Sequence, residues 1–173
     1  MSTLLQGNRT RRICLDAVMV VLAMMLSYLE AVLPLNVLIP LPGFRLGLAN
    51  VIVTLVFVLI SPIDAAIVSA LRILLMGILF GSVTSFYFSA LGGLCAFLTL
   101  LFCSYLLRRC SFLGVSVLCA AAHNCGQILA AVTIFGVSLI FSYLPWLLLA
   151  SAIYGGIVGI LLNLCVPRMK RLL

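Results

Sequence analysis

The sequence predicts an all-α fold: an integral membrane bundle of about six transmembrane helices, with the N- and C-termini on the cytoplasmic side. Of the 173 residues, 66% are apolar and 8% are charged, whereas a soluble domain carries about 25% charged residues. The mean hydropathy is +1.42. A spanning helix takes about 20 residues, so six helices use nearly the whole chain and leave no room for a soluble catalytic domain.

The apolar residues form six segments, each expected to be one helix: 13–33, 46–60, 64–80, 85–107, 112–135 and 143–166. The first follows three arginines, but it is too long for the apolar region of a signal peptide and lacks a small-residue cleavage site. We therefore expect it to be retained. The second ends at Ser61-Pro62, because proline disfavours helical geometry in the preceding residue.

The later segments have similar boundaries. The third begins at Asp64, the fourth ends before two arginines, and the sixth ends before Pro167. The chain is thus divided into a basic N-terminal tail (1–12), a six-helix transmembrane domain (13–166) and a basic C-terminal tail (167–173).

The positions of the basic residues orient the bundle, because cytoplasmic loops retain lysine and arginine. An internal N-terminus places eight of them on the cytoplasmic side: Arg9, Arg11, Arg12, Arg108, Arg109, Arg168, Lys170 and Arg171. We therefore expect a multi-pass protein of the cytoplasmic membrane. The net charge of +7 reflects this topology and contact with anionic membrane lipids, and we expect no nucleic-acid partner.

Four polar residues occupy positions where polar groups are unfavourable: Glu30, Arg45, Asn50 and Arg72. A charged side chain at membrane depth destabilises the protein unless it is paired, hydrated or used for function. In one interpretation, Glu30 pairs with an arginine and only holds the helices together. In the other, these residues line a water-accessible pocket open to the outside. Two cations against one carboxylate would suit an anionic or electron-rich solute.

The 112–135 segment contributes His123, Asn124 and Gln127. His123 and Gln127 are four residues apart and share a helix face. A histidine here can be an interhelical hydrogen-bond partner, a ligand contact or part of a proton relay. Cys119 shares that face, but two ligands without a nearby carboxylate do not predict a metal site.

The remaining features favour packing over chemistry. We expect Asp16 and Asp64 to compensate the dipoles at helix starts. The seven cysteines contain no CxxC pair and indicate buried thiols. Gly155 and Gly159 have the GxxxG spacing that permits close helix contact. The apolar loop 34–45 is expected to fold back as a lid over the pocket.

Enzymatic functions lack the residues they need. Prenyl diphosphate chemistry requires clustered aspartates that hold magnesium, and the chain has only two aspartates, far apart. A nucleotide-binding motif is also missing. We therefore expect no catalytic residues and no cofactor. A transporter of this kind must run downhill, couple to an ion or depend on an ATPase in partner subunits.

Several motifs resemble one protein family: Leu46-Gly47-Leu48-Ala49-Asn50, Ser27-Tyr28-Leu29-Glu30 before it, and Phe80-Gly81-Ser82 and His123-Asn124-Cys125-Gly126-Gln127 after it. The family is known as heptaprenyl diphosphate synthase component I and also as the Gx transporter family. It is similar in size and helix count to the S components of energy-coupling factor (ECF) transporters. Those bind vitamins and assemble with a membrane coupling subunit and ATPase subunits.

The resemblance implies which polar positions are characteristic of the family: Glu30, Arg45, Asn50, Arg72, His123, Asn124 and Gln127. One S-component feature is not matched. Their Ala-x-x-x-Ala contact motif has no counterpart, because Ala17 and Ala23 are six residues apart.

We therefore expect a substrate-binding subunit for uptake of a small solute similar to a vitamin or cofactor precursor, with these seven residues as its pocket and partner subunits as its energy source. The alternative is a non-catalytic membrane partner in heptaprenyl diphosphate biosynthesis. A passive channel is disfavoured, because the inner halves of the helices show no continuous polar stripe.

Overall fold

The computed structural model describes residues 9–32, 47–80, 83–106, 111–136 and 144–172, and in these ranges it contains six α-helices and no strand. The helices are α1 (Arg9–Val32), α2 (Asn50–Leu59), α3 (Pro62–Phe80), α4 (Val83–Leu106), α5 (Phe112–Phe135) and α6 (Leu144–Leu172). The all-α prediction is confirmed.

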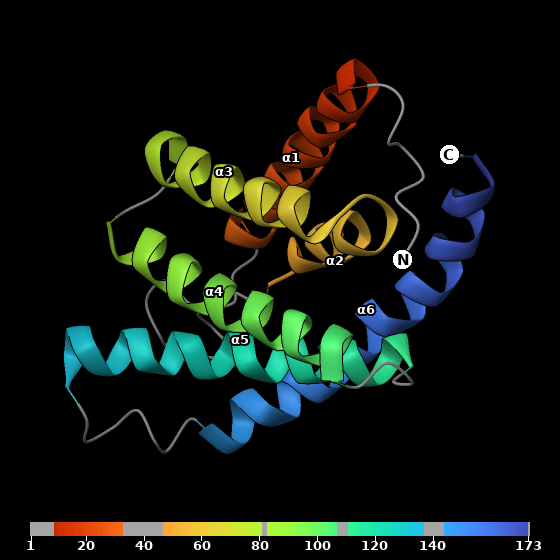
Figure 1. The fold of residues 1–173 in the computed structure, drawn as a ribbon. Helices are drawn as coiled ribbons and strands as arrows, with labels where there is room; N and C mark the ends of the chain where they lie inside the picture. The colour runs from red at the N-terminus through yellow and green to blue at the C-terminus, as the bar shows by residue number, and fades with distance from the viewer. Residues whose placement is uncertain (1–8, 33–46, 81–82, 107–110, 137–143, 173) are drawn as a thin grey trace.

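The helices form two groups of three (Figure 1). In the first group, α1 and α2 pack against α3 and against each other; in the second, α5 packs against both α4 and α6. The groups meet where α3 contacts α4 and where α2 contacts α4 and α6. The short helix α2 is therefore the central element between the two groups.

Five helices are long and apolar enough to cross a membrane, and α2 is not. The 10 residues of α2 measure about 15 Å, half the thickness of the hydrocarbon layer. Eight of them are buried, whereas the long helices expose large apolar side chains such as Ile78 and Trp146. The chain is thus a multi-pass membrane protein in which α2, shorter than the expected 46–60 segment, is enclosed by other helices.

Two helix ends differ from expectation. α1 begins at Arg9 and not at Ile13, and α6 continues through Pro167 to Leu172. Proline removes one backbone N–H and crowds the carbonyl four residues earlier, but near a helix end water can hydrate that carbonyl. The expected stop at Pro167 is therefore wrong, and both helices extend into the segments expected to be basic tails.

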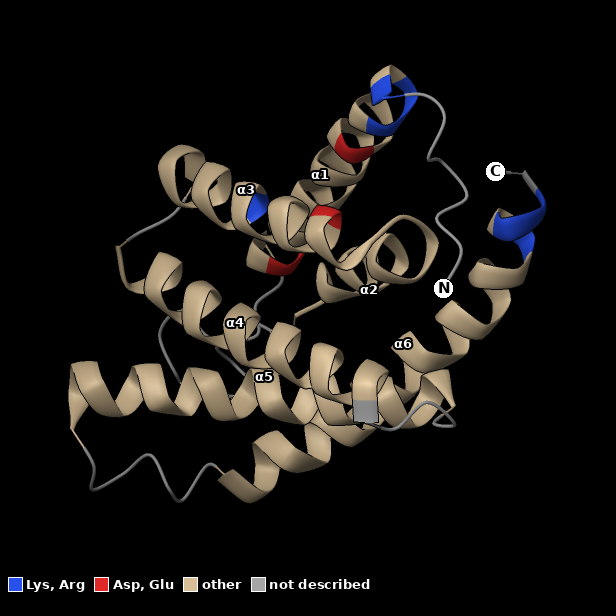
Figure 2. Ribbon diagram, viewed as in Figure 1, with Lys and Arg blue, Asp and Glu red and all other residues tan. Residues whose placement is uncertain are grey.

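The basic residues of the two chain ends lie toward the same side of the bundle. Figure 2 shows lysine and arginine at the start of α1 and at the end of α6, both toward the upper right of the view. This arrangement agrees with termini on one side of the membrane. The cytoplasmic location of that side stays a prediction, and Arg108 and Arg109 lie outside the described residues.

Close packing of α4, α5 and α6 depends on glycines. A Cβ at Gly126 of α5 would lie 2.6 Å from the carbonyl oxygen of Leu91 on α4. A Cβ at Gly159 of α6 would lie 2.5 Å from the Cα of Leu113 on α5, and Gly155 approaches α5 as closely. The GxxxG pair thus packs α6 against α5 within the chain.

We predict that Gly159→Ala lowers the free energy of unfolding by about 1–3 kcal/mol, because the added methyl group forces the α5 and α6 backbones apart. Gly156→Ala is the matched control, since a Cβ there meets nothing within 4 Å. We expect it to be neutral or to stabilise by up to about 1 kcal/mol through helix propensity. Denaturant unfolding in detergent micelles measures both, and equal effects would contradict the packing argument.

Candidate functional site

The imidazole of His123 is the centre of a buried polar cluster. His123 lies on α5 and is 2% exposed. Its Nε2 lies 2.8 Å from the Nε2 of Gln127, one turn later on the same helix. Its Nδ1 lies 3.2 Å from the Nδ2 of Asn50 at the start of α2. The shared face of His123 and Gln127 is confirmed, and the cluster joins α5 to α2.

The two amides and the ring constrain one another. A neutral imidazole has one donor and one acceptor nitrogen, whereas each amide offers either an NH₂ donor or a carbonyl acceptor. One amide therefore donates to the bare ring nitrogen, and the other accepts from the ring N–H. Moving the ring proton to the other nitrogen and flipping both amides gives a second arrangement with the same contacts. The cluster can thus present either a donor or an acceptor to a solute.

Glycines let the backbone approach the imidazole at two edges. A Cβ at Gly47 would lie 3.1 Å from the Cδ2 of His123, and a Cβ at Gly92 on α4 would lie 2.7 Å from its Cε1. Gly47 also has a φ of +86°, a conformation that other residues rarely adopt. Gly47 thus makes both the turn before α2 and the contact with the ring.

Glu30 extends this cluster to α1. It lies near the end of α1, is 3% exposed, and its Oε1 accepts a hydrogen bond from the N–H of Gly47 at 2.5 Å. The carboxylate therefore holds the turn that places Asn50 against His123. We call Glu30, Gly47, Asn50, His123 and Gln127 the His123 network.

Arg72 on α3 lies beside the His123 network and is 4% exposed. One terminal guanidinium nitrogen donates to the Oγ of Ser27 on α1 at 3.1 Å. The other lies 3.6 Å from the place that a Cβ at Gly93 would take. Ser27 lies one turn before Glu30 on the same face of α1, so the guanidinium is next to the Glu30 end of the His123 network. Arg72 therefore adds positive charge next to groups that can donate or accept.

Two of the predicted site residues are not placed in this cluster. Asn124 is 3% exposed, but its Nδ2 donates to the carbonyl oxygen of Leu147 at 2.8 Å and so ties α5 to the first turn of α6. Successive helical residues point about 100° apart, which explains why Asn124 and its neighbour His123 face different helices. Arg45 and the expected lid at 34–45 lie outside the described residues.

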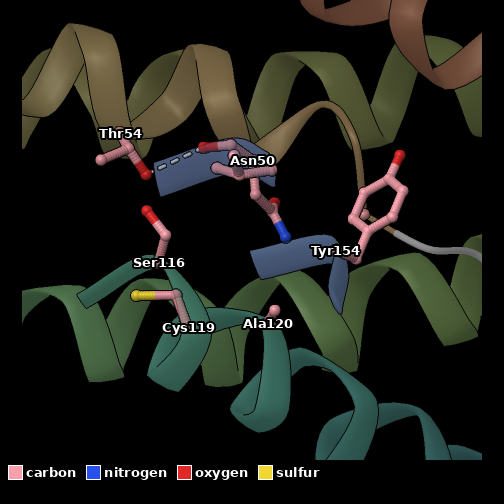
Figure 3. Close-up of a pocket in the computed structure, with 8 residues that line it drawn as sticks. Asn50, Thr54, Ser116, Cys119, Ala120 and Tyr154 are labelled. Atoms are coloured by element: carbon pink, nitrogen blue, oxygen red, sulfur yellow. Dashed lines mark hydrogen bonds between the residues drawn. The ribbon is translucent and has the colours of Figure 1, made fainter. Parts of the chain in front are cut away.

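The expected opening of the site to the outside stays a prediction, because the loop at 34–45 lies outside the described residues. Within those residues the site is buried. Four of its charged or polar side chains are 1–4% exposed: Glu30, Arg72, His123 and Gln127. Two small cavities adjoin Asn50, one of about 20 Å³ between α2, α5 and α6 (Figure 3) and one of about 10 Å³ between α2, α4 and α5. Each has room for about one water molecule.

An ion pair that the sequence did not predict joins the starts of α1 and α3. The Arg12 guanidinium donates to both carboxylate oxygens of Asp64, at 2.7 and 2.9 Å, and to the Oγ of Ser61 at 3.1 Å. The Ser61 hydroxyl donates to Asp64 and accepts from its backbone N–H. Ser61 is thus the N-cap of α3, and the Ser-x-x-Asp spacing was its signal in the sequence. Arg12 had been assigned to the tail.

The predictions for Asp16 and Asp64 have different outcomes. Asp64 lies in the first turn of α3 as expected. Asp16 does not begin a helix, because α1 already starts at Arg9 and has no acidic residue in its first turn. The role predicted for Asp16 at the helix start is therefore wrong.

Comparison with known proteins places the chain in a family. A family model described as "Heptaprenyl diphosphate synthase component I" matches residues 19–165. The chain belongs to this family. The matched range of this component I protein contains the whole His123 network together with Arg72, so the resemblance inferred from the motifs is confirmed. No curated protein and no solved structure matches the chain, and the likeness to S components stays a prediction.

We predict an energetic coupling between Arg12 and Asp64 in this component I protein. Arg12→Gln and Asp64→Asn should each destabilise the fold, and the double variant should lose about 1 kcal/mol less than the sum, because a bidentate, half-buried pair is removed once. Arg168→Gln, an exposed arginine on α6, should change stability by less than about 0.5 kcal/mol. A double-mutant cycle in micelles measures the coupling, and strict additivity would contradict it.

Proposed function

We propose that this chain is the solute-binding subunit of a small-solute uptake system in the cytoplasmic membrane, with the His123 network and Arg72 as its site. One observation carries the proposal. Glu30, Arg72, His123 and Gln127 come from three different helices of an apolar bundle, yet all are 1–4% exposed and gather beside one short helix.

The cost of burying a charge makes Arg72 a candidate for a binding role. Placing one arginine at the centre of a membrane helix costs about 2.5–3.5 kcal/mol on insertion scales. The hydrogen bond from Arg72 to Ser27 is one of the contacts that offset this cost. An arginine at this depth is by default a candidate for a functional site, which supports a role in binding a solute.

The chemistry of the site indicates the class of solute. Arg72 supplies positive charge, and the His123 ring with the amides of Asn50 and Gln127 supplies reversible donors and acceptors. A small anionic or polar molecule similar to a vitamin or cofactor precursor fits these groups. It would bind by taking over hydrogen bonds that the side chains now make with one another.

Contacts from α1 hold the turns at both ends of α2. Release of one of these contacts would let the site open. Glu30 holds the turn before α2 through Gly47, and Arg12 holds the turn after α2 through Ser61 and Asp64. The two contacts are about 27 Å apart along α1 at 1.5 Å per residue. A tilt of α2 that releases one contact can leave the other intact, and rocking of this kind would move a solute without chemistry in this chain.

Energy for uptake would come from partner subunits, since the sequence has no nucleotide-binding motif. The family description calls its members a "component", which is consistent with a multi-subunit assembly. A membrane coupling subunit and ATPase subunits are the partners we propose. The chain itself is proposed to be no enzyme, because its two aspartates are far apart and Asp64 is paired with Arg12.

The family description also favours a second candidate function. The words "heptaprenyl diphosphate synthase" fit a non-catalytic membrane partner of a prenyl synthase. In that case the His123 network would only hold the helices together, and a soluble catalytic subunit would bind the cytoplasmic ends of the helices.

We predict that Arg72→Met abolishes retention of the bound solute while the protein stays folded. Methionine keeps much of the side-chain volume and adds no polar group of its own, and thermal unfolding checks that the variant is folded. The matched control is Arg168→Met, which removes an exposed arginine from α6. Native mass spectrometry of the protein purified from its own membranes reads out the solute, and full retention by the Arg72 variant would refute the site.

Affinity purification separates the two functions. A tagged chain purified in mild detergent should bring down a membrane coupling subunit and ATPase subunits if it serves uptake. Recovery of a soluble prenyl synthase subunit in their place would establish the second candidate and reject the first.

A further inference from the structure

Ser116 on α5 differs from the other helical hydroxyl residues in its contacts. It is 5% exposed, and its Oγ has no hydrogen-bond partner among the described residues. The hydroxyls of Ser104, Thr133 and Ser151 each donate to a backbone carbonyl of their own helix. A buried hydroxyl without a partner is unfavourable by about 1–3 kcal/mol, so the Ser116 Oγ is free to bond to something else.

The Ser116 hydroxyl points into the cavity between α2, α5 and α6. Figure 3 shows it directed across the cavity toward Thr54 on α2, with Asn50 one turn away. The hydroxyl of Thr54 is occupied, because it donates to the Asn50 carbonyl. Ser116 therefore faces the same part of α2 that binds His123, but from outside the His123 network.

The two cavities flank one stretch of α2. Asn50, Thr54 and Cys119 line both of them. The second cavity continues along α2 between apolar side chains, including Phe97 and Leu100 of α4. A displacement of α2 away from α5 would join the two spaces into one groove that is polar at Asn50 and Ser116 and apolar beyond.

We propose that this groove is a second part of the solute site and that Ser116 is a binding residue. The inference rests on the proposed function and refines it. The solute is amphipathic: one hydrogen-bonding group meets Asn50 and Ser116, and an apolar ring or short chain lies along α2 toward Leu100. A fully polar solute such as a sugar or an inorganic ion does not match this lining.

Cys119 provides a reporter in the groove. In a variant that keeps only this cysteine, methyl methanethiosulfonate, which is neutral, should label the thiol about tenfold faster than in a variant that keeps only Cys103. That factor corresponds to about 1.4 kcal/mol in the free energy of opening. Cys103 is the matched control because it is also buried, at 2% against 6% exposure.

Filling the groove with a larger side chain should remove the difference in labelling rate between Cys119 and Cys103. Ser116→Leu should slow labelling of Cys119 by about tenfold, because opening then has to displace an added side chain. Ser151→Leu is the matched control, because Ser151 on α6 is similarly buried, at 3% exposure. In this variant the labelling rate of Cys119 should stay unchanged. Thermal unfolding of each variant confirms that it is folded.

Two results would overturn the inference. They are equal labelling of Cys119 and Cys103 by methyl methanethiosulfonate, or unchanged labelling of Cys119 in the Ser116 variant. Neither of these affects the loss of solute in the Arg72→Met variant, so the groove can fail while the proposed function stands. Conversely, Cys119 could be labelled selectively while no purified preparation of the protein contains a solute. That result would support the groove and reject the proposed uptake function.

Discussion

The hydrogen bonds of the His123 imidazole are the constraint on which the arrangement of the central helices depends. A ring that is 2% exposed in an apolar bundle must find partners for both nitrogens inside the protein. Gln127 lies on the same helix and is always near, but Asn50 reaches the ring only if α2 begins beside it. The turn at Gly47 and its hydrogen bond to Glu30 set that beginning. The position of α2 therefore follows from the needs of one side chain.

Glycines give this polar centre its close surroundings. Gly92 and Gly93 bring α4 against the imidazole and the guanidinium, while Gly126 and Gly159 bring α4 and α6 against α5. At these glycines the long helices pack backbone against backbone, and the short α2 lies between the two groups. Close backbone packing on one side and small cavities beside α2 are the features on which the proposed movement of α2 rests.

Much of the fold could be predicted from the sequence, and less of the site. Apolar runs of about 20 residues identify spanning helices by length alone, which is why α3, α4 and α5 match expectation closely. The start of α1, the continuation of α6 past Pro167 and the short α2 depend on hydration and packing that a single sequence does not show. His123 and Gln127 followed from helical spacing, whereas the Arg12–Asp64 pair and the contact of Asn124 with Leu147 depend on which helices are neighbours in space.

The central claim is that the His123 network binds a solute and does not merely join helices. Because the chain has one histidine, ¹⁵N-histidine labelling gives NMR signals from this ring alone. The signals can be compared between protein as purified from its membranes and protein washed free of small molecules. Our account predicts that washing shifts both ring nitrogens, since the solute replaces internal partners, and that returning the extracted small-molecule fraction restores them. Identical signals in all three samples would contradict it.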